Sequence, residues 1–575
     1  MRKWRGIVGI ALLLAAAVTV WWVWHVTEVK GLILEGGHPL VGVVVRVKAT
    51  DYETTTDEHG AFVLKGFPPA FRLHVTAWVD GYYVGGGVAW PWRSTVIISL
   101  QRYWTSDNPH YAWIPPKVED RSALTEFLMR MGLATAARLS FNKLFLPLAS
   151  RLELGCADCH GRTIYDQWAA SAHAQGTNNI RFQTMYNGTD TRGHKSPPTR
   201  QGYNRDYGSF PLRPDPSQPY YGPGFKLDFP DQAGNCASCH MPTEAVNAPY
   251  DTDITRIEST ALQGISCDIC HKVADVRVDP TTQLPYENMP GVLSMKLRRP
   301  NGEPQMFFGP YDDVDVGPDT FSPLQNKSRF CAACHNASFW GTPIYQSYSE
   351  WLASPYPQEG KTCQACHMKP DGVTSNFAPG RGGVKRDPKT IFTHNFPGAA
   401  NVELLQNTAK LELSAHQEGD RLLVEVRVTN ENAGHDIPTD HPMRNILLVV
   451  SASDAQGHKL EFLGDQIIPD WGGVGDEPDD YGGRPGKGYA KILEERWTEV
   501  SPTAAYWNPT VIREDTRIPA KATDVTHYEF RLAERSGPIT VEAKLIFRRA
   551  FKQLVEQKKW KLKDILMEDK QVIVP

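Results

Sequence analysis

The segment SRFCAACHNASFWGTPIYQSYSEWLASPYPQEGKTCQACHMKP, residues 328–370, carries the pattern that decides the fold. It contains two C-x-x-C-H strings, which begin at Cys331 and Cys363. The same string begins three more times upstream, at Cys156, Cys236 and Cys267. The chain has 10 cysteines, so the five strings use all of them and leave none for a disulfide bond or a nucleophile.

The C-x-x-C-H string is the attachment signature of c-type haem. Its two thiols form thioethers with the porphyrin, and the adjacent imidazole binds the iron as the proximal ligand. Zinc is the alternative, since C-x-x-C pairs also build four-ligand zinc sites, but those sites do not require a histidine directly after the second cysteine. The sequence therefore predicts five covalently bound haem c groups. The predicted attachment residues are Cys156, Cys159, Cys236, Cys239, Cys267, Cys270, Cys331, Cys334, Cys363 and Cys366. The predicted proximal ligands are His160, His240, His271, His335 and His367.

Haem is attached to this string outside the cytoplasm, so the chain needs an export segment. Arg2, Lys3 and Arg5 precede an uncharged run from Gly6 to Trp24, which is long enough to span a membrane as a helix. Residues 1–28 are therefore predicted to be a membrane anchor or a signal segment, with Ala15 to Ala17 as a small-residue cleavage site in the second case. We favour the retained anchor, which would place the bulk of the protein in the periplasm or at the cell surface.

The predicted fold class is multidomain. An N-terminal transmembrane helix leads to a small β-sandwich at residues 29–102, where Val43, Val45 and Val47 alternate with polar residues. A linker and a helix follow at 103–150. Residues 151–400 are predicted to form a haem-packed, mostly α or irregular pentahaem domain. An antiparallel β-sandwich at 401–550 and a solvated tail at 551–575 complete the chain.

The function depends on the sixth ligand of each iron, because two histidines give a low-spin centre and an open position gives a reactive one. His173 is the leading distal candidate. It lies 13 residues after His160, too far along one helix to bind the same iron, so we expect it to serve a neighbouring haem. His194, His394 and His435 are further candidates, and His110, His416 and His441 are reserves.

Two resemblances extend these predictions. The stretch GLILEGGHPLVGVVVRVKATDYETTTDEHGAFVLKGF, residues 31–67, resembles carboxypeptidase regulatory-like β-sandwiches. The strings CADCHGRTIYDQWAASAHAQ, GISCDICHKVADV and AGHDIPT resemble multihaem cytochromes of the tetrahaem cytochrome c and hydroxylamine-oxidoreductase group. The second resemblance implies His173, His394 and His435 as distal ligands and haems packed in near-contact pairs. Pentahaem nitrite reductases differ, because they carry C-x-x-C-K at the catalytic haem.

Three functions fit this sequence. An electron carrier between a membrane-side donor and an external or periplasmic acceptor is favoured over an enzyme. The first alternative is an oxidoreductase with one open haem that acts on a small nitrogen or sulfur compound, and the second is a subunit of a cytochrome filament. The expected partners are redox proteins, the membrane through the N-terminal helix, and further copies of the chain. The net charge of −4 does not favour nucleic acid. Lys272 is expected to be a surface charge.

Overall fold

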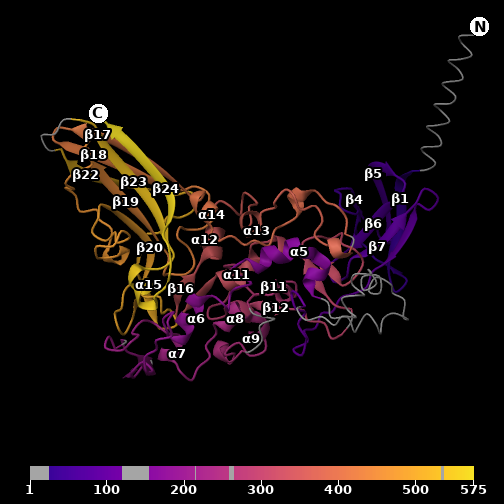
Figure 1. Cartoon of the computed structure of the whole chain (residues 1–575). Helices are drawn as coiled ribbons and strands as arrows, with labels where there is room; N and C mark the ends of the chain where they lie inside the picture. The colour runs from indigo at the N-terminus through magenta and orange to yellow at the C-terminus, as the bar shows by residue number, and fades with distance from the viewer. Residues whose placement is uncertain are drawn as a thin grey trace, which may run out of the picture.

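The computed structural model describes residues 25–118, 155–206, 208–213, 215–257, 264–302, 304–381, 383–532 and 537–575. Two β regions lie at opposite ends of an elongated molecule, and the part of the chain with the cysteine motifs lies between them (Figure 1). Helices are few and short, and most of the regular structure is strand.

The N-terminal β region consists of two four-stranded sheets that share one core. The first sheet contains β1 (Val26–Glu35), β2 (His38–Pro39), β5 (Ala61–Ala70) and β8 (Thr95–Ser99). The second contains β3 (Val44–Val47), β4 (Glu53–Thr55), β6 (Leu73–Trp78) and β7 (Gly85–Ala89). Val29 and Ile33 from β1 are buried together with Val45 and Val75 from the other sheet, as the period-2 pattern requires.

This β region packs directly on the central part of the chain. The hydroxyl of Thr320 donates to the carbonyl of Tyr82 at 2.6 Å, and the indole of Trp78 donates to the same hydroxyl at 3.2 Å. The ring of Trp78 also meets Phe321 edge-on at 4.8 Å. These contacts fix the N-terminal sheets against one wall of the central cavity described below.

The central part consists of short helices and two-stranded sheets. The helices are α5 (Cys156–Ala169), α6 (Ile180–Asn187), α7 (Phe225–Asp228), α8 (Ala237–His240), α9 (Pro242–Ala245), α10 (Cys267–Cys270), α11 (Arg329–His335), α12 (Ser347–Ala353) and α13 (Cys363–His367). The strands are β9 (Gln201–Asn204), β10 (Gly208–Pro211), β11 (Val273–Val276), β12 (Met295–Leu297), β13 (Phe307–Gly309), β14 (Asp319–Phe321), β15 (Ala337–Phe339) and β16 (Thr342–Tyr345). The 3₁₀ turns in the chain are η1 (Ile254–Arg256), η2 (Gly291–Leu293), η3 (Pro323–Asn326), η4 (Pro379–Arg381), η5 (Pro388–Thr390) and η6 (Asp470–Gly472).

The prediction of a mostly helical central domain is wrong. Several of its helices comprise a single turn of four residues, for example α8 and α10, and paired strands separate them. The local reason is that each cysteine string needs only one helical turn, while the surrounding Gly- and Pro-rich segments do not sustain a 3.6-residue repeat.

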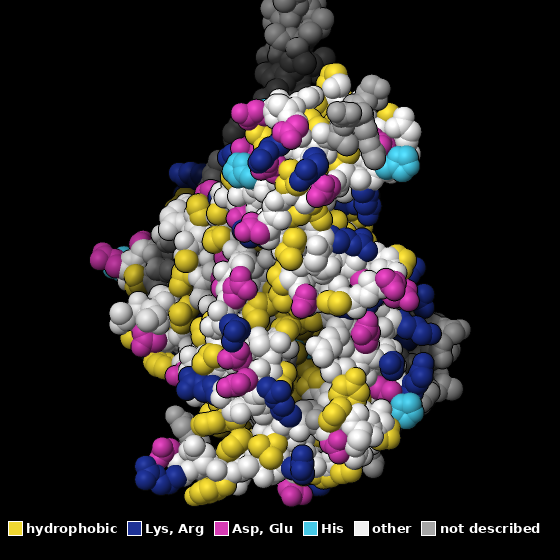
Figure 2. All heavy atoms as spheres, turned by 90° about the vertical axis from the view of Figure 1, so that its left-hand side faces the viewer, with side chains coloured by type: hydrophobic (Ala, Val, Ile, Leu, Met, Phe, Trp, Pro, Cys, Tyr) yellow, Lys and Arg dark blue, Asp and Glu magenta, His cyan; other side chains and the backbone are white. Residues whose placement is uncertain are grey.

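The C-terminal β region contains two antiparallel sheets. The three-stranded sheet is formed by β17 (Ala409–Glu418), β18 (Arg421–Asn430) and β22 (Thr523–Arg531). The five-stranded sheet is formed by β19 (Asn445–Ser453), β20 (Gly486–Glu495), β21 (Thr510–Asp515), β23 (Ile539–Arg548) and β24 (Ile565–Val574). Short helices α14 (Val402–Gln406) and α15 (Lys552–Lys558) flank them. On the described face that Figure 2 shows, acidic and basic side chains are interspersed.

The chain after residue 550 differs from the predicted solvated tail. It forms α15 and then β24, which pairs with β23 along the edge of the five-stranded sheet. Met567 and Val574 are buried on the inner face of β24. The consecutive charged residues Glu568, Asp569 and Lys570 interrupt the alternation of apolar and polar residues that would have predicted this strand from the sequence.

Two buried lysines attach the C-terminal β region to the central part. Lys491 on β20 donates to the carbonyl of Ile344 at 2.6 Å. Lys558 at the end of α15 donates to the carbonyls of Thr184, Thr189 and Pro223 at 2.8, 3.2 and 2.6 Å. Because a buried ammonium must be hydrogen-bonded, these contacts specify how the two parts join.

In the part of the chain that the structure describes, no helix has the length and apolar character needed to cross a membrane, so the predicted membrane anchor gains no support there. The apolar run from Gly6 to Trp24 lies outside the described residues. So does all of the helix predicted within the 103–150 segment, from about Ser122 to Ser150.

Candidate cofactor site

Each cysteine string begins a short helix or lies within one. We number the strings in chain order: motif 1 (156–160, α5), motif 2 (236–240, α8), motif 3 (267–271, α10), motif 4 (331–335, α11) and motif 5 (363–367, α13). One helical turn brings residues three and four apart onto the same side, so both thiols and the imidazole of a motif face one space. None of the 10 cysteines, all of which the structure describes, is in a disulfide bond.

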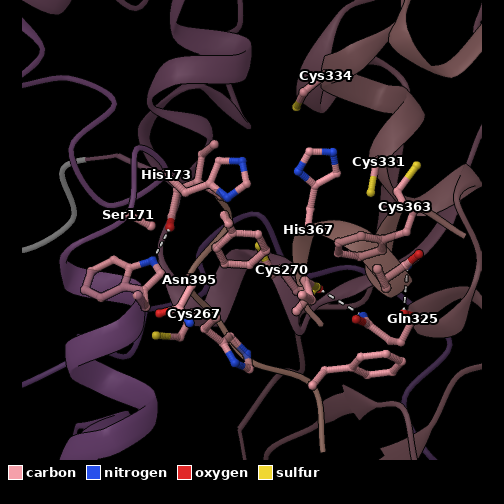
Figure 3. Close-up of a pocket in the computed structure, with 18 of the residues that line it drawn as sticks. Ser171, His173, Cys267, Cys270, Gln325, Cys331, Cys334, Cys363, His367 and Asn395 are labelled. Atoms are coloured by element: carbon pink, nitrogen blue, oxygen red, sulfur yellow. Dashed lines mark hydrogen bonds between the residues drawn. The ribbon is translucent and has the colours of Figure 1, made fainter. Parts of the chain in front are cut away.

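All five motifs line one cavity of about 1730 Å³. Pockets for single small molecules usually measure about 300–1,000 Å³, so this space exceeds that range. Figure 3 shows His173 and His367 projecting into the cavity among thiols that come from motifs 3, 4 and 5. The cavity therefore has room for groups larger than a single small molecule.

The proximal histidines are held in one tautomer by hydrogen bonds. Nδ1 of His160, His271 and His367 lies 2.9, 2.6 and 2.8 Å from the carbonyls of Phe377, Phe308 and Pro397, respectively. A carbonyl only accepts, so Nδ1 must donate and the lone pair of Nε2 remains for a metal. In motif 2, His240 is hydrogen-bonded to the backbone of Gly176.

In motif 4 the partner is a carboxylate. Nδ1 of His335 lies 3.0 Å from Oδ2 of Asp440. Burial alone would lower the pKa of His335, but Asp440 outweighs burial and raises it to about 9. The His335 side chain is 43% exposed, and it lines the cavity.

Two of the predicted distal histidines face proximal ones at the spacing that an iron would require. The ring centroids of His173 and His335 are 6.3 Å apart, and those of His435 and His367 are 6.4 Å apart. With metal–nitrogen bonds of about 2.0 Å, two imidazoles on opposite sides of one iron would have centroids roughly 6.3 Å apart. The structure therefore fits bis-histidine ligation at motifs 4 and 5.

His173 is positioned by the segment that leads into motif 3. It lies in the turn after α5, and its carbonyl accepts a hydrogen bond from the N–H of Ile265 at 2.9 Å. Gly264 makes this approach possible, since it has a positive φ of 76° and a Cβ there would lie 2.4 Å from the same carbonyl. With the backbone held in this way, the ring of His173 lies 6.3 Å from that of His335 in motif 4.

His394 is also suited to bind a metal. Its Nδ1 is buried without a hydrogen-bond partner among the described residues, and burial lowers its pKa to about 3. Its nearest charged neighbours include His271 and His160, so it lies between motifs 3 and 1. A buried neutral imidazole with an unpaired nitrogen is the form in which histidine binds iron.

His441 lines the cavity as well, although it was only a reserve candidate. Burial lowers its pKa to about 3, and its ring packs against Tyr345 and Tyr506 at 6.1 and 5.3 Å. His240 of motif 2 is among its electrostatic neighbours. The signal that could have found it is its place six residues after His435 in the same loop.

The structure does not bring His194 to the cavity. Its Nδ1 lies 2.8 Å from Asp190, and half of its side chain is exposed. His110 and His416 are exposed too. Four histidines outside the motifs, His173, His394, His435 and His441, therefore line the cavity within the described residues.

The loop between β18 and β19, residues 431–444, carries several of these groups, and we call it the ligand loop. It is held against α12, which follows motif 4. Glu350 accepts from the N–H of Asp436 at 3.2 Å and from the hydroxyl of Thr439 at 2.5 Å. Glu350 also pairs with Arg517 from the C-terminal β region. Motif 4 and the ligand loop thus form one rigid unit.

Thiols of different motifs lie within hydrogen-bonding reach of each other. Cys156 of motif 1 contacts Cys267 of motif 3. Cys334 of motif 4 contacts Cys239 of motif 2, and Cys331 of motif 4 contacts Cys363 of motif 5. Motif 4 therefore contacts two other motifs, 2 and 5. The described residues include no group of three or more His, Cys, Asp or Glu side chains arranged to hold a metal ion.

Lys272, expected at the surface, is fully buried beside motif 3. Its ammonium lies 2.7 Å from Oδ1 of Asp268, which is also fully buried, and 3.7 Å from the centroid of the Phe307 ring. The phenol of Tyr111 and the N–H of Ile114 donate to the other oxygen of Asp268 at 3.0 and 2.8 Å. The pair is structural, because every charged atom has a partner.

No protein family matches the sequence in a scan of family profiles. No curated protein matches it either. Among solved structures, a penta-haem cytochrome c552 from Thermochromatium tepidum is 20% identical, covers 73% of this chain and 97% of its own, and gives a TM-score of 0.47. The N-terminal domain of a Streptococcus gordonii adhesin is 11% identical over 30% of this chain and 33% of its own, with a TM-score of 0.13.

Proposed function

We propose that this protein is a multihaem c-type cytochrome that binds five haems and transfers electrons. One observation carries the proposal: five C-x-x-C-H motifs, each on a helical turn, open into a single cavity that four further histidines also line. When bound, c-type haem supplies one-electron redox chemistry.

The residues present fit that cofactor. Thiols stand in pairs, as thioether bonds require, and an imidazole follows each pair. In motifs 1, 3 and 5 the hydrogen bond of Nδ1 to a carbonyl leaves Nε2 for a metal. The opposed rings at motifs 4 and 5 match two axial ligands of one iron. His394, with an unpaired buried nitrogen, is a ligand for motif 3 or motif 1.

Electron transfer is favoured over other uses of haem because the motifs lie next to each other in space. Their thiols connect motif 1 to motif 3, and motif 4 to motifs 2 and 5. Electrostatic proximity of Cys270 to Cys334 joins motif 3 to motif 4. Groups bound at successive motifs would be neighbours, and the protein would set their potentials by ligation, burial and hydrogen bonding. The donor and acceptor are proposed to be redox proteins.

An oxidoreductase is the second candidate, and one observation favours it. The described cavity wall offers four distal imidazoles for five motifs. His394 is the imidazole shared between His271 and His160, so one of these two motifs lacks a histidine of its own. A haem there would keep a position for a small ligand.

The test is to measure the mass and spectrum of the mature protein. Electron transfer through five haems requires an intact mass with five covalent haems and a pyridine haemochrome ratio of five per chain. A double Cys363→Ala, Cys366→Ala variant serves as the matched control and should lose one haem. A protein that retained zinc, or that showed no Soret band, would refute the proposal. Electron paramagnetic resonance then separates the candidates, since a high-spin fraction of one in five that binds nitrite or cyanide supports the oxidoreductase.

A further inference from the structure

The proximal histidines differ in the group that accepts a hydrogen bond from Nδ1, the ring nitrogen that would not bind the iron. At motifs 1, 3 and 5 the acceptor is a backbone carbonyl, and at motif 2 the backbone of Gly176 lies beside His240. At motif 4 it is the carboxylate of Asp440, 3.0 Å from Nδ1 of His335. Of the five proximal ligands, His335 is the one bonded to a formal negative charge.

Asp440 is held firmly in that position. Its side chain is only 12% exposed, and the hydroxyl of Ser347 donates to Oδ1 at 2.7 Å, which leaves Oδ2 for His335. The guanidinium of Arg444 is 4.0 Å from Oδ2, and its hydrogen bond goes to the carbonyl of Thr439 at 3.1 Å. Among the described residues, Arg444 is the basic side chain other than His335 that pairs with Asp440, and at 4.0 Å it does so only loosely.

We propose that Asp440 lowers the reduction potential of the haem bound at motif 4 below the potentials of haems held by carbonyl-bonded histidines. This inference rests on the proposed haem binding. A carboxylate draws the Nδ1 proton toward itself more strongly than a carbonyl does, so Nε2 becomes a better electron donor. A stronger axial donor and a nearby negative charge both favour the ferric over the ferrous state. Asp440 is thus a positioning residue that acts through His335.

The place of motif 4 gives this effect a role. Its thiols contact those of motifs 2 and 5, and Cys270 of motif 3 is nearby. The site with the lowest potential would therefore stand at the junction of the array and be reduced last. Electrons would reduce the haems bound at the other four motifs before they reduced the haem bound at motif 4.

The competing explanation is that Asp440 only orients the ring. Asp440→Asn separates the two, because an asparagine carbonyl still accepts from Nδ1 but carries no charge. The measurement is a redox titration of the holoprotein, followed optically and by electron paramagnetic resonance. We expect the reduction potential of one haem, the one bound at motif 4, to rise in the variant. The expected change is at least tenfold in the reduction equilibrium constant, which is about 59 mV for one electron. An unchanged set of five potentials would overturn the proposal.

Asp436→Asn is the matched control. It removes the same charge from the same loop, but only the backbone carbonyl of Asp436 meets a histidine, at 3.0 Å from Nδ1 of His435. It should shift the motif 4 couple much less than Asp440→Asn. Equal shifts in both variants would show a general charge effect and refute the specific role.

Ser347→Ala gives a second, opposite test should Asp440→Asn fail to fold. Without the hydroxyl, the charge on Asp440 would concentrate on its bond to His335, and the same couple should fall. A rise or no change would count against the proposal. The haem content of each variant is measured in parallel. Five haems with unmoved potentials refute the tuning alone, whereas missing haem refutes the proposed function.

Discussion

The imidazole rings of His367 and His435 lie 6.4 Å apart with only 16° between their planes. One belongs to a cysteine motif, and the other comes from the ligand loop, 68 residues later in the chain. His367 donates to the carbonyl of Pro397 at 2.8 Å, and Nδ1 of His435 donates to that of Asp436 at 3.0 Å. In both rings Nε2 therefore keeps its lone pair, and the 6.4 Å spacing fits two axial ligands of one iron.

Replacing His435 by alanine should convert one haem to the high-spin state. The haem stays attached through Cys363 and Cys366, so the haem content should not change, and added imidazole should restore the low-spin spectrum. The measurement is electron paramagnetic resonance of the oxidised protein. His194→Ala is the control, since His194 pairs with Asp190 away from the cavity and should leave the spectrum as it is.

Lys272→Met should destabilise the protein strongly. The substitution leaves the fully buried carboxylate of Asp268 without its cation, which typically costs about 3–5 kcal/mol. Denaturant unfolding followed by circular dichroism measures the change. The double variant Asp268→Asn, Lys272→Met should recover much of the loss. Lys361→Met, which removes an exposed lysine paired with Glu359, should change little. A single variant as stable as the wild type would show that the pair is dispensable.

Lys558→Met tests the attachment of the C-terminal β region. Methionine has a similar volume but leaves the carbonyls of Thr184, Thr189 and Pro223 without their shared donor. An unsatisfied buried acceptor costs about 1–3 kcal/mol, so the melting temperature should fall. Differential scanning calorimetry provides the measurement, and Lys559→Met, at the exposed neighbouring position, is the control. Equal melting temperatures in all three proteins would contradict this role.

Acid should weaken the contact between α7 and the turn that begins at Asp253. Burial alone would raise the pKa of Asp253, but the Thr255 hydroxyl and the Lys226 ammonium together lower it to about 2. Because this value is below that of the unfolded chain, the stabilisation is present above about pH 4 and is lost as the pH falls toward 2. At pH 6, Asp253→Asn should lose on the order of 1–2 kcal/mol after solvent screening. Melting curves of both proteins should converge near pH 2, and a constant gap between them would exclude this linkage.

The cysteine motifs could be predicted from sequence because their geometry is local. A thiol pair and an imidazole within five residues need only one helical turn, whatever surrounds them. His173 and His435 could also be proposed from sequence, but their opposite partners, His335 and His367, could not. Those pairings depend on long-range contacts such as the hydrogen bond from Ile265 to the carbonyl of His173.

Other features were hidden for physical reasons. From the sequence, Asp440 is an ordinary acidic residue in a loop. Its contact with His335 depends on how the folded chain places this loop beside motif 4. Lys272 reads as a surface charge until Asp268 and Tyr111 are seen to enclose it. The central part was expected to be mostly α or irregular, because its strands of three or four residues are too short to give a period-2 signal. The charged residues in β24 kept the sequence pattern from predicting this edge strand.

The position of the ligand loop has a consequence for biogenesis. All five thiol pairs and His173 come before His394, His435 and His441 in the chain. If haem is attached as proposed, a product that stopped before residue 394 could carry every cofactor and the His173 ligand, but it would lack the other three imidazoles and the strands of the C-terminal β region. The carboxy-terminal third would therefore complete the axial ligation after the covalent step.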